Sequence, residues 1–185
     1  ARIAGYAADP HLDGDLGGED GTTAQIVIND YQAKCLNLSA SPFIDVDTQD
    51  RKKLVGLLDT LGNADLGGRV YQTAKGYRVA LNQEMPPGHL FSRILPERLW
   101  RAFGVDTSYC RFSLVMGTFR ARQTAKPWRI DPNPIIYENL SRFERYRYPV
   151  ARFLETFGHG APTPQIRAIW EAHDQTVITS SAHLY

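Results

Sequence analysis

The sequence has few of the residues that mark a disulfide-stabilised or membrane-spanning protein. Its 185 residues include only two cysteines, Cys35 and Cys110, which lie far apart in the chain. Two such cysteines do not form a disulfide framework, so we predict two reduced, buried thiols in a cytoplasmic protein. No apolar run approaches the ~20 residues that cross a bilayer, and the start of the chain has no secretory signal pattern. We therefore expect no membrane partner.

Several common chemical motifs are also missing. The glycine pairs match neither a phosphate-binding loop nor a dinucleotide fingerprint, and no serine lies in a nucleophile-elbow motif. His173 and Asp174 form the His-Asp pair that some metal-dependent phosphohydrolases use, but such sites need further histidines from earlier helices, where this chain has few. For His173 we predict a packing or capping role on an amphipathic helix.

Charge is distributed unevenly along the chain. The formal net charge is +1, but residues 1–50 carry two basic and nine acidic residues, whereas residues 69–152 carry fifteen basic and six acidic ones. The first block therefore has a net charge of −7 and the second a net charge of +9. An acidic site facing a basic body suits metal ions acting on a polyanion, and it equally suits charge complementarity within one protein.

The order of the predicted elements indicates an α+β fold. Residues 36–47 predict a strand with a break near 39–42, followed by a helix that begins at Asp47 or Thr48 and ends at residues 62–63. A hairpin is predicted over residues 69–81, helices over 96–103 and 106–116, and a strand over 119–122. This βαββαβ order predicts a ferredoxin-like, RNA-recognition-type antiparallel sheet with helices on one face.

The chain divides into three predicted parts. Residues 1–35 predict a polar, glycine-rich arm with a short helix between Thr22 and Ala33, and residues 36–134 predict the α+β core. Residues 135–185 predict a C-terminal helical extension, with helices over 137–157 and from Thr163 or Pro164 onward. The chain begins at Ala1 rather than Met, as a piece of a larger protein would.

Asp45 and Asp47 are the leading candidates for a chemical site. They alternate with the apolar residues of the predicted strand around Phe43–Val46, so both carboxylates would lie on one face of it. Two adjacent carboxylates repel each other unless a cation lies between them, and such oxygens bind Mg²⁺ or Mn²⁺. The alternative is an ordinary strand end at which Asp47 or Thr48 caps the next helix.

Lys75 and Arg78 lie in the predicted hairpin, which can pair with the Asp45 strand. The pairing would bring these two cationic side chains toward the carboxylates. There they would bind the phosphates of a nucleoside triphosphate, while the metal lowers the pKa of the attacking hydroxyl. This combination is the minimal set of groups for metal-dependent nucleotidyl transfer.

A second basic group lies downstream, with Phe119 and Trp128 among its members: Arg120, Arg122, Lys126 and Arg129. Arg120 and Arg122 are two residues apart, so they would share one face of a strand. Guanidinium groups beside aromatic rings suit phosphate binding combined with base stacking, which predicts a nucleic-acid contact. The alternative is a solvated strand face with Trp128 in the core.

The segments Phe43–Asp47 and Tyr71–Val79 together resemble the catalytic core of the archaeo-eukaryotic primase and primase-polymerase superfamily. The resemblance covers roughly residues 40–131. It implies a palm-like sheet that uses two divalent metal ions, a third carboxylate and a nucleotide-binding histidine. Arg78 stands where that family has the histidine, so the position keeps its charge but not its identity.

Asp131 is the best candidate for the third carboxylate that the resemblance implies, and Asp106 is the second. A helix-capping role is the better interpretation of Asp106. The leading hypothesis is therefore a metal-dependent nucleotidyl transferase of primase type, acting on DNA or RNA with a nucleoside triphosphate. The alternatives are a non-catalytic nucleic-acid-binding module of a replication, plasmid or other mobile-element protein, and a protein-interaction domain.

Overall fold

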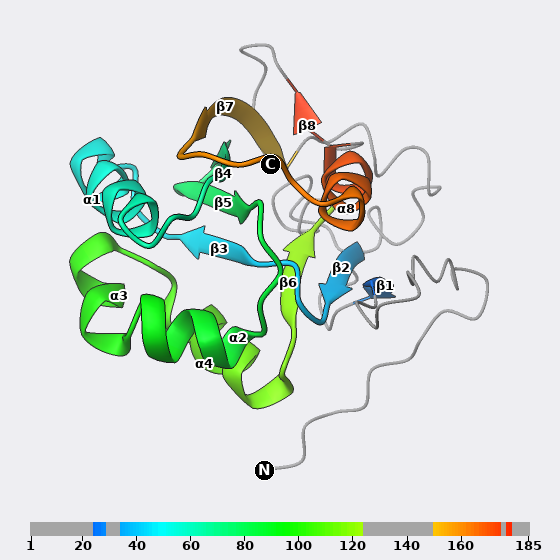
Figure 1. The fold of residues 1–185 in the computed structure, drawn as a ribbon, viewed down its shortest axis with the longest axis horizontal. Coiled ribbons are helices and arrows are strands. Elements are labelled where there is room, and N and C mark those ends of the chain that lie inside the picture. Colours follow the sequence, from blue (N-terminus) through cyan, green and yellow to red (C-terminus); the bar gives the residue numbers. More distant parts are fainter. Residues whose placement is uncertain (1–23, 29–33, 124–149, 175–176, 179–185) are drawn as a thin grey trace, which may run out of the picture.

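A computed structural model describes residues 24–28, 34–123, 150–174 and 177–178. These residues form an α+β fold with two sheets and helices on both sides of the larger one (Figure 1). The elements in chain order are β1 (Ala24–Ile28), β2 (Lys34–Leu38), β3 (Phe43–Val46), α1 (Arg51–Gly62), β4 (Gly68–Thr73), β5 (Tyr77–Leu81), α2 (Pro87–His89), the π-helical turn η1 (Leu90–Ile94), α3 (Glu97–Phe103), α4 (Thr107–Met116), β6 (Phe119–Arg122), β7 (Ala151–Phe157), α8 (Pro164–Asp174) and β8 (Val177–Ile178).

The smaller sheet has the antiparallel order β1-β2-β6. The predicted helix near residues 22–33 is wrong for Ala24–Ile28, which pairs with β2 along its whole length. Its run of β-branched residues favours a strand once a partner edge is present. The predicted strand over residues 36–47 is two strands in different sheets, because the chain passes from one sheet to the other at the break near Ser39–Pro42.

The larger sheet has the order β3-β5-β4-β7-β8, antiparallel except for the β7–β8 pair. The hairpin predicted over residues 69–81 is confirmed as β4 and β5, and β5 also pairs with β3 as expected. However, β6 pairs with β2 instead of completing this sheet. The α+β class and the antiparallel pairing are therefore confirmed, but the single βαββαβ sheet is not what forms.

Helix α1 combines a polar cap with a leucine face. The Asp50 side chain accepts a hydrogen bond from the backbone N–H of Lys52, which satisfies one of the open donors at the helix start. Leu54, Leu57 and Leu61 recur at helical spacing and are fully buried. The helix therefore lies where predicted, although it begins after Asp50 rather than at Asp47 or Thr48.

The helices α3 and α4 follow their predicted signals. Gly104 ends α3 with a left-handed backbone (φ 69°), a conformation that suits glycine. Asp106 caps α4 by accepting hydrogen bonds from the backbone N–H groups of Ser108 and Tyr109, which confirms the capping interpretation. Cys35 and Cys110 are both buried, as predicted.

The C-terminal part is only partly helical. Residues 151–157 were predicted to end a long helix, but they form β7, which pairs with β4 across a bulge at Val70 and Tyr71. From Phe153 to Phe157, half-buried and exposed side chains alternate along β7, beyond the two residues that pair with β8. Helix α8 is confirmed, and its buried side chains fall on the predicted face: Ile166, Ile169, Trp170 and His173. None of the described helices is long and apolar enough to cross a membrane.

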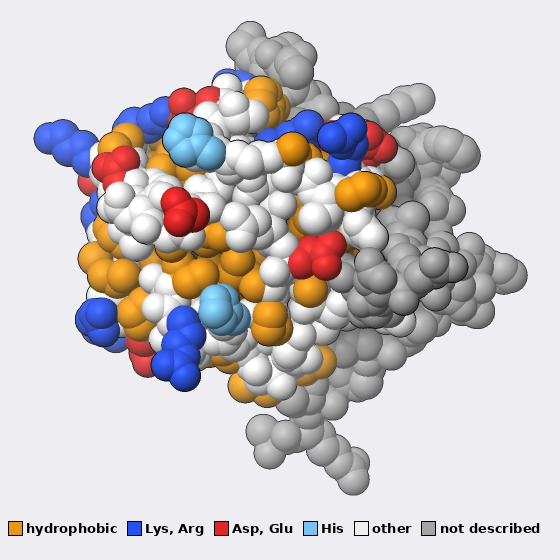
Figure 2. Space-filling model, in the orientation of Figure 1, with side chains coloured by type: hydrophobic (Ala, Val, Ile, Leu, Met, Phe, Trp, Pro, Cys, Tyr) orange, Lys and Arg blue, Asp and Glu red, His pale blue; other side chains and the backbone are white. Residues whose placement is uncertain are grey.

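The larger sheet presents two chemically different faces. Ile44, Val79 and Val70 are opposite one another in β3, β5 and β4 and are fully buried. The row continues at Glu155 of β7, which pairs with Arg51 of α1, so it faces α1. The next row, one residue along each strand, consists of Asp45, Arg78 and Tyr71, and it points the other way, toward α8. On the outside of the molecule, apolar side chains lie between scattered charges of both signs (Figure 2).

Candidate functional site

The centre of the α8 face is an ion pair between neighbouring strands. The β3–β5 register places Asp45 directly opposite Arg78. Arg78 Nε lies 2.7 Å from Asp45 Oδ1, and its Nη2 lies 3.4 Å from Oδ2, so one guanidinium contacts both carboxylate oxygens. The Arg78 side chain is 3% exposed and that of Asp45 is 28% exposed. This pair is therefore partly desolvated, so its stability depends more on good hydrogen-bond geometry than that of a surface ion pair does.

Arg78 is also held from its other side. Its Nη1 donates a hydrogen bond to the backbone carbonyl of Arg122 at 3.0 Å and lies 3.2 Å from Nε2 of His173. A guanidinium has only donors, so Nε2 of His173 must be the acceptor. His173 therefore carries its proton on Nδ1, which donates to Asp174 Oδ1 at 3.2 Å. The geometry thus defines a neutral histidine with one tautomer.

The network continues to a second arginine, Arg69 on β4. Asp174 Oδ2 binds Nη1 of Arg69 at 2.5 Å, and the Arg69 guanidinium lies 4.6 Å from the centre of the Trp170 ring. The His173 ring contacts two aromatic rings of the sheet, with centroid distances of 5.1 Å to Phe43 and 4.7 Å to Tyr71. A continuous polar chain therefore runs from β3 through β5 and α8 to β4 inside an aromatic setting.

Burial and charge set the protonation states of this chain. Burial is the main cause that lowers the pKa of His173, and the Arg78 charge lowers it further, although Asp174 acts in the opposite direction. For Arg78, burial acts to lower the pKa, but the Asp45 carboxylate outweighs it and holds the pKa above its usual value. At neutral pH we therefore expect a charged Arg78 beside a neutral His173.

Two further arginines lie close to this pair. Burial raises the pKa of the Cys35 thiol to about 11, while the charges of Arg122, Arg120 and Arg78 all act to lower it. In the β2–β6 pair, Arg122 is opposite Cys35 and Arg120 is opposite Asn37. Arg120 also lies 4.5 Å from the centre of the Phe112 ring. The two β6 arginines are partly exposed on one face of the strand, as the sequence predicts. We call Arg78, Arg120 and Arg122 the arginine cluster.

The other predicted site residues differ in their placement. Lys75 lies in the exposed turn between β4 and β5. Asp47 follows the last residue of β3, is exposed, and donates its backbone N–H to the Gly104 carbonyl at 2.8 Å. Thr48 does not cap α1 directly, but its hydroxyl accepts the N–H of Asp50. Asp131, Lys126 and Arg129 lie outside the described residues.

A divalent metal site does not fit these contacts as they stand. The Arg78 guanidinium already contacts both oxygens of Asp45. A divalent metal ion bound to these oxygens would be repelled by the positive charge of Arg78. Within the described ranges, no group of three or more His, Cys, Asp or Glu side chains could hold a metal ion. Of the described residues, the set near Asp45 is thus built for a guanidinium–carboxylate contact.

The sequence interpretation missed the roles of His173 and Asp174 in this network. Their signal was available, because His173 falls on the same helical face as buried Ile166 and Ile169. A histidine on a buried face needs hydrogen-bond partners, and only the fold could identify Arg78 as one of them. Comparisons of the chain with protein-family models, with curated proteins and with solved structures found no match.

Proposed function

We propose that this protein is a nucleic-acid-binding module that contacts the phosphate backbone through Arg120 and Arg122 of its arginine cluster and does not transfer nucleotides. The observation that carries the proposal is the contact of Arg78 with both oxygens of Asp45. In a primase-type site these oxygens would face metal ions. Here they neutralise Arg78, which stands where the primase superfamily has a histidine. The proposed protein therefore has a palm-type sheet that binds nucleic acid without catalysis.

Strand order supports the palm-type part of the proposal. The unit β3–α1–β4–β5 forms adjacent strands in the order β3-β5-β4, with β5 antiparallel to both neighbours. This is the arrangement of the first half of a ferredoxin-like or RNA-recognition-type sheet. The likeness ends at β6, which pairs in the other sheet, and the proposed function does not require the second half.

Charge supports the nucleic-acid part. The arginine cluster combines three guanidinium groups with the Phe112 ring, a composition that suits phosphate contacts and stacking. Arg120 and Arg122 are half-buried, and Nε of both residues and Nη1 of Arg122 are buried. A ligand would therefore contact the remaining guanidinium nitrogens. We include Lys126 and Arg129, which follow β6 in the sequence, in the proposed contact surface.

Fluorescence anisotropy with labelled single-stranded DNA, duplex DNA and single-stranded RNA tests the binding. We expect affinity to fall linearly with the logarithm of the salt concentration, and the double variant Arg120→Gln, Arg122→Gln to flatten that slope by roughly one unit per lost phosphate contact. Arg167→Gln, on the exposed side of α8, is the matched control for loss of charge. Binding that ignores salt, or that the double variant leaves unchanged, would contradict the proposal.

Metal-dependent nucleotidyl transfer is the second candidate. It is favoured by the partial exposure of Asp45 and the exposed position of Asp47 directly after β3. Primer extension with Mg²⁺ or Mn²⁺ and all nucleoside triphosphates separates the two candidates. Metal-dependent extension that disappears in the double variant Asp45→Ala, Asp47→Ala would establish the enzyme, whereas nucleic-acid binding without extension supports the binding module.

A further inference from the structure

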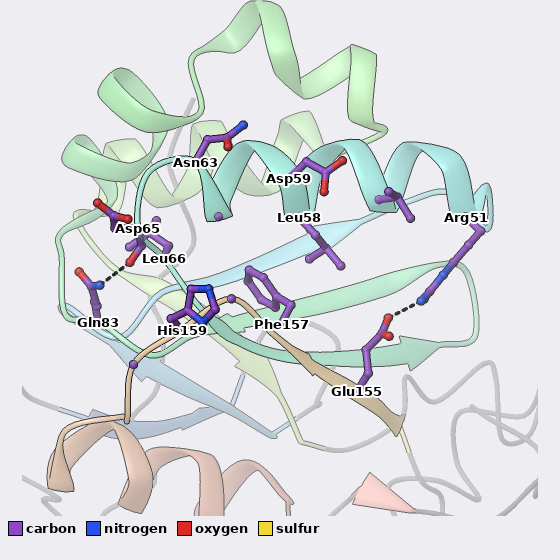
Figure 3. A pocket seen from close by; sticks show the side chains of 14 residues that line it. Arg51, Leu58, Asp59, Asn63, Asp65, Leu66, Gln83, Glu155, Phe157 and His159 are labelled. Carbon is purple, nitrogen blue, oxygen red and sulfur yellow. Dashed lines mark hydrogen bonds and ion pairs between the residues drawn. The ribbon is translucent and has the colours of Figure 1, made fainter.

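A groove lies on the α1 face of the larger sheet, away from the arginine cluster. It has a volume of about 820 Å³ and runs between α1 and the second half of β7 (Figure 3). Residues from α1, from the turn that follows it and from the 158–160 loop form its walls. The rows of the sheet that face α1 and α8 alternate, so this groove and the Asp45–Arg78 pair are on opposite faces.

The floor of the groove is apolar. Leu58 of α1 points toward Phe157 of β7 across it, Val55 also lines it, and Leu66 lies toward one end. Val55 is 44% exposed, and Leu58 and Phe157 are only partly buried. Leu58 and Phe157 pack against the core with part of their surface, so together with Val55 they form an apolar stripe at the margin of the leucine face that the fold leaves partly accessible.

The rim of the groove is mainly acidic. Asp59, Asp65 and Glu155 line it, against the single fixed cation Arg51, which is itself paired with Glu155. Asp59 and Asp65 are both exposed; Asp65 lies at the end of the groove beside Leu66, and Asp59 lies midway along α1. An apolar floor beside excess negative charge complements a ligand that carries both an apolar surface and positive charge.

The end of the groove near the 158–160 loop is rigidly built. The Asn82 side chain accepts a hydrogen bond from the Gly67 N–H at 3.1 Å and donates to the carbonyls of His159 and Gly160 at 2.7 and 2.9 Å. Gln83 donates to the Asp65 carbonyl at 2.8 Å. A preformed wall loses little conformational entropy when a ligand binds, which favours recognition.

The shape of the groove favours a helix as its occupant. The α1 residues that line it recur at helical spacing, so they form one ridge along the helix axis: Arg51, Val55, Leu58, Asp59 and Gly62. A second helix packs beside such a ridge at a distance of about 8–10 Å, and Gly62 has no heavy atom near the position of a Cβ, which leaves room for a close approach. An added β-strand would instead lie beyond the edge of β7, in the plane of the sheet, rather than over its side chains.

We propose that this groove, which we call the α1–β7 groove, binds an amphipathic helix of a partner protein. The apolar stripe of that helix packs on Val55, Leu58 and Phe157. Lysine or arginine residues beside the stripe pair with Asp59, Asp65 and Glu155. The groove is thus an interaction surface that is independent of nucleic-acid binding on the opposite face.

Three synthetic peptides test the proposal by fluorescence anisotropy: a leucine–lysine peptide with leucines on one helical face, the same peptide with glutamate replacing lysine, and the leucine–lysine peptide with a central proline. We expect the first to bind and the other two to bind at least roughly ten-fold more weakly. Asp59→Lys should weaken binding of the first peptide by a similar factor. Glu171→Lys, an exposed α8 position, should not change its affinity.

Hydrogen exchange of the complex locates the bound peptide. We expect added protection of backbone amides in residues 51–62 and 155–160, and none in β6. Equal affinity for the glutamate or proline peptide, equal weakening by Asp59→Lys and Glu171→Lys, or protection away from the groove would each overturn the proposal. Circular dichroism of Asp59→Lys checks that the variant is folded, and Val55→Lys introduces a second positive charge on the same wall.

Discussion

The two faces of the larger sheet are stabilised in different ways, although their residues alternate along the same strands. On the α1 face, the leucines of α1 and Ile44, Val70 and Val79 are fully buried in one hydrophobic core. The α8 face holds a chain of charged and polar groups that begins at Asp45 and ends at Arg69. Apolar packing tolerates changes that preserve volume, whereas a buried polar chain depends on each partner.

The comparison suggests a division of roles. The charged groups of the α8 face pair with one another, and this pairing fixes the orientation of Arg78 next to the β6 arginines. The α1 face leaves an apolar stripe uncovered beyond its leucine core, where side chains are available to a partner. Stability measurements distinguish the two faces, since only the α8 face should be destabilised by the loss of a single charge.

Removal of Arg78 should have the largest effect. The variant Arg78→Met leaves the Asp45 carboxylate, the Arg122 carbonyl and His173 Nε2 without their common donor. Breaking a buried pair on one side costs about 3–5 kcal/mol, and the partial exposure of Asp45 places this one toward the lower end. Urea unfolding followed by circular dichroism measures the change.

The control for this variant is Arg167→Met, on the exposed side of the same helix that covers the site. It should change the free energy of unfolding by no more than about 0.5 kcal/mol. A loss below about 1 kcal/mol for Arg78→Met would mean that the α8 face does not depend on this network. The double variant Asp45→Val, Arg78→Val should recover part of the loss, because it removes the stranded carboxylate.

The pH dependence of stability should come next in size. The folded state lowers the pKa of His173, so below the usual histidine pKa of about 6.5 the unfolded state binds a proton that the folded state does not. The stabilisation is therefore fully present above that pH and declines as the pH falls, by up to about 1.4 kcal/mol per pH unit. Urea unfolding between pH 5 and 7.5, values chosen to span this range, measures the slope.

His173→Gln should flatten this slope, whereas His159→Gln, at an exposed position in the α1–β7 groove, should leave it unchanged. The glutamine can still accept from Arg78 through its carbonyl oxygen. If the slope survives His173→Gln, the acid sensitivity arises from other groups and the tautomer assigned to His173 has no thermodynamic consequence.

Local signals in the sequence predicted the parts of the fold that local chemistry decides. Asp106 and Gly104 mark helix ends through capping and a left-handed turn, and the leucine spacing marks α1. The β4–β5 hairpin follows from its tight turn. In contrast, β7 and the split between β2 and β3 depend on which distant strand edge is available, and no local pattern contains that information.

The same distinction applies to the candidate site. Asp45 and Arg78 were predicted to approach each other because strand β3 and the hairpin are close in sequence, and the structure brings them together. His173 reaches Arg78 from α8, ninety-five positions away along the chain. Its partners follow only from how α8 packs on the sheet, which the amphipathic pattern of α8 leaves open.

A smaller effect is expected at the cap of α1. Asp50→Ala removes the side-chain acceptor for the Lys52 N–H, and loss of such a cap costs about 1 kcal/mol. Thermal unfolding measures the change. Asp59→Ala, an exposed acidic residue of the same helix without a cap role, is the control and should stay within about 0.5 kcal/mol. Equal losses in both variants would point to general charge effects instead of capping.

The smallest effect separates the two stripes of α1. Val55→Ser removes an apolar side chain that is 44% exposed, so it should change the free energy of unfolding by about 0.5 kcal/mol or less. Leu54→Ser changes the neighbouring residue, which is fully buried. It should lower the free energy of unfolding several-fold more, because it creates a cavity and buries a hydroxyl. If Val55→Ser is neutral for folding yet weakens the leucine–lysine peptide, the uncovered stripe serves binding. A large loss of stability in Val55→Ser would instead assign Val55 to the core and remove the main apolar contact from the α1–β7 groove.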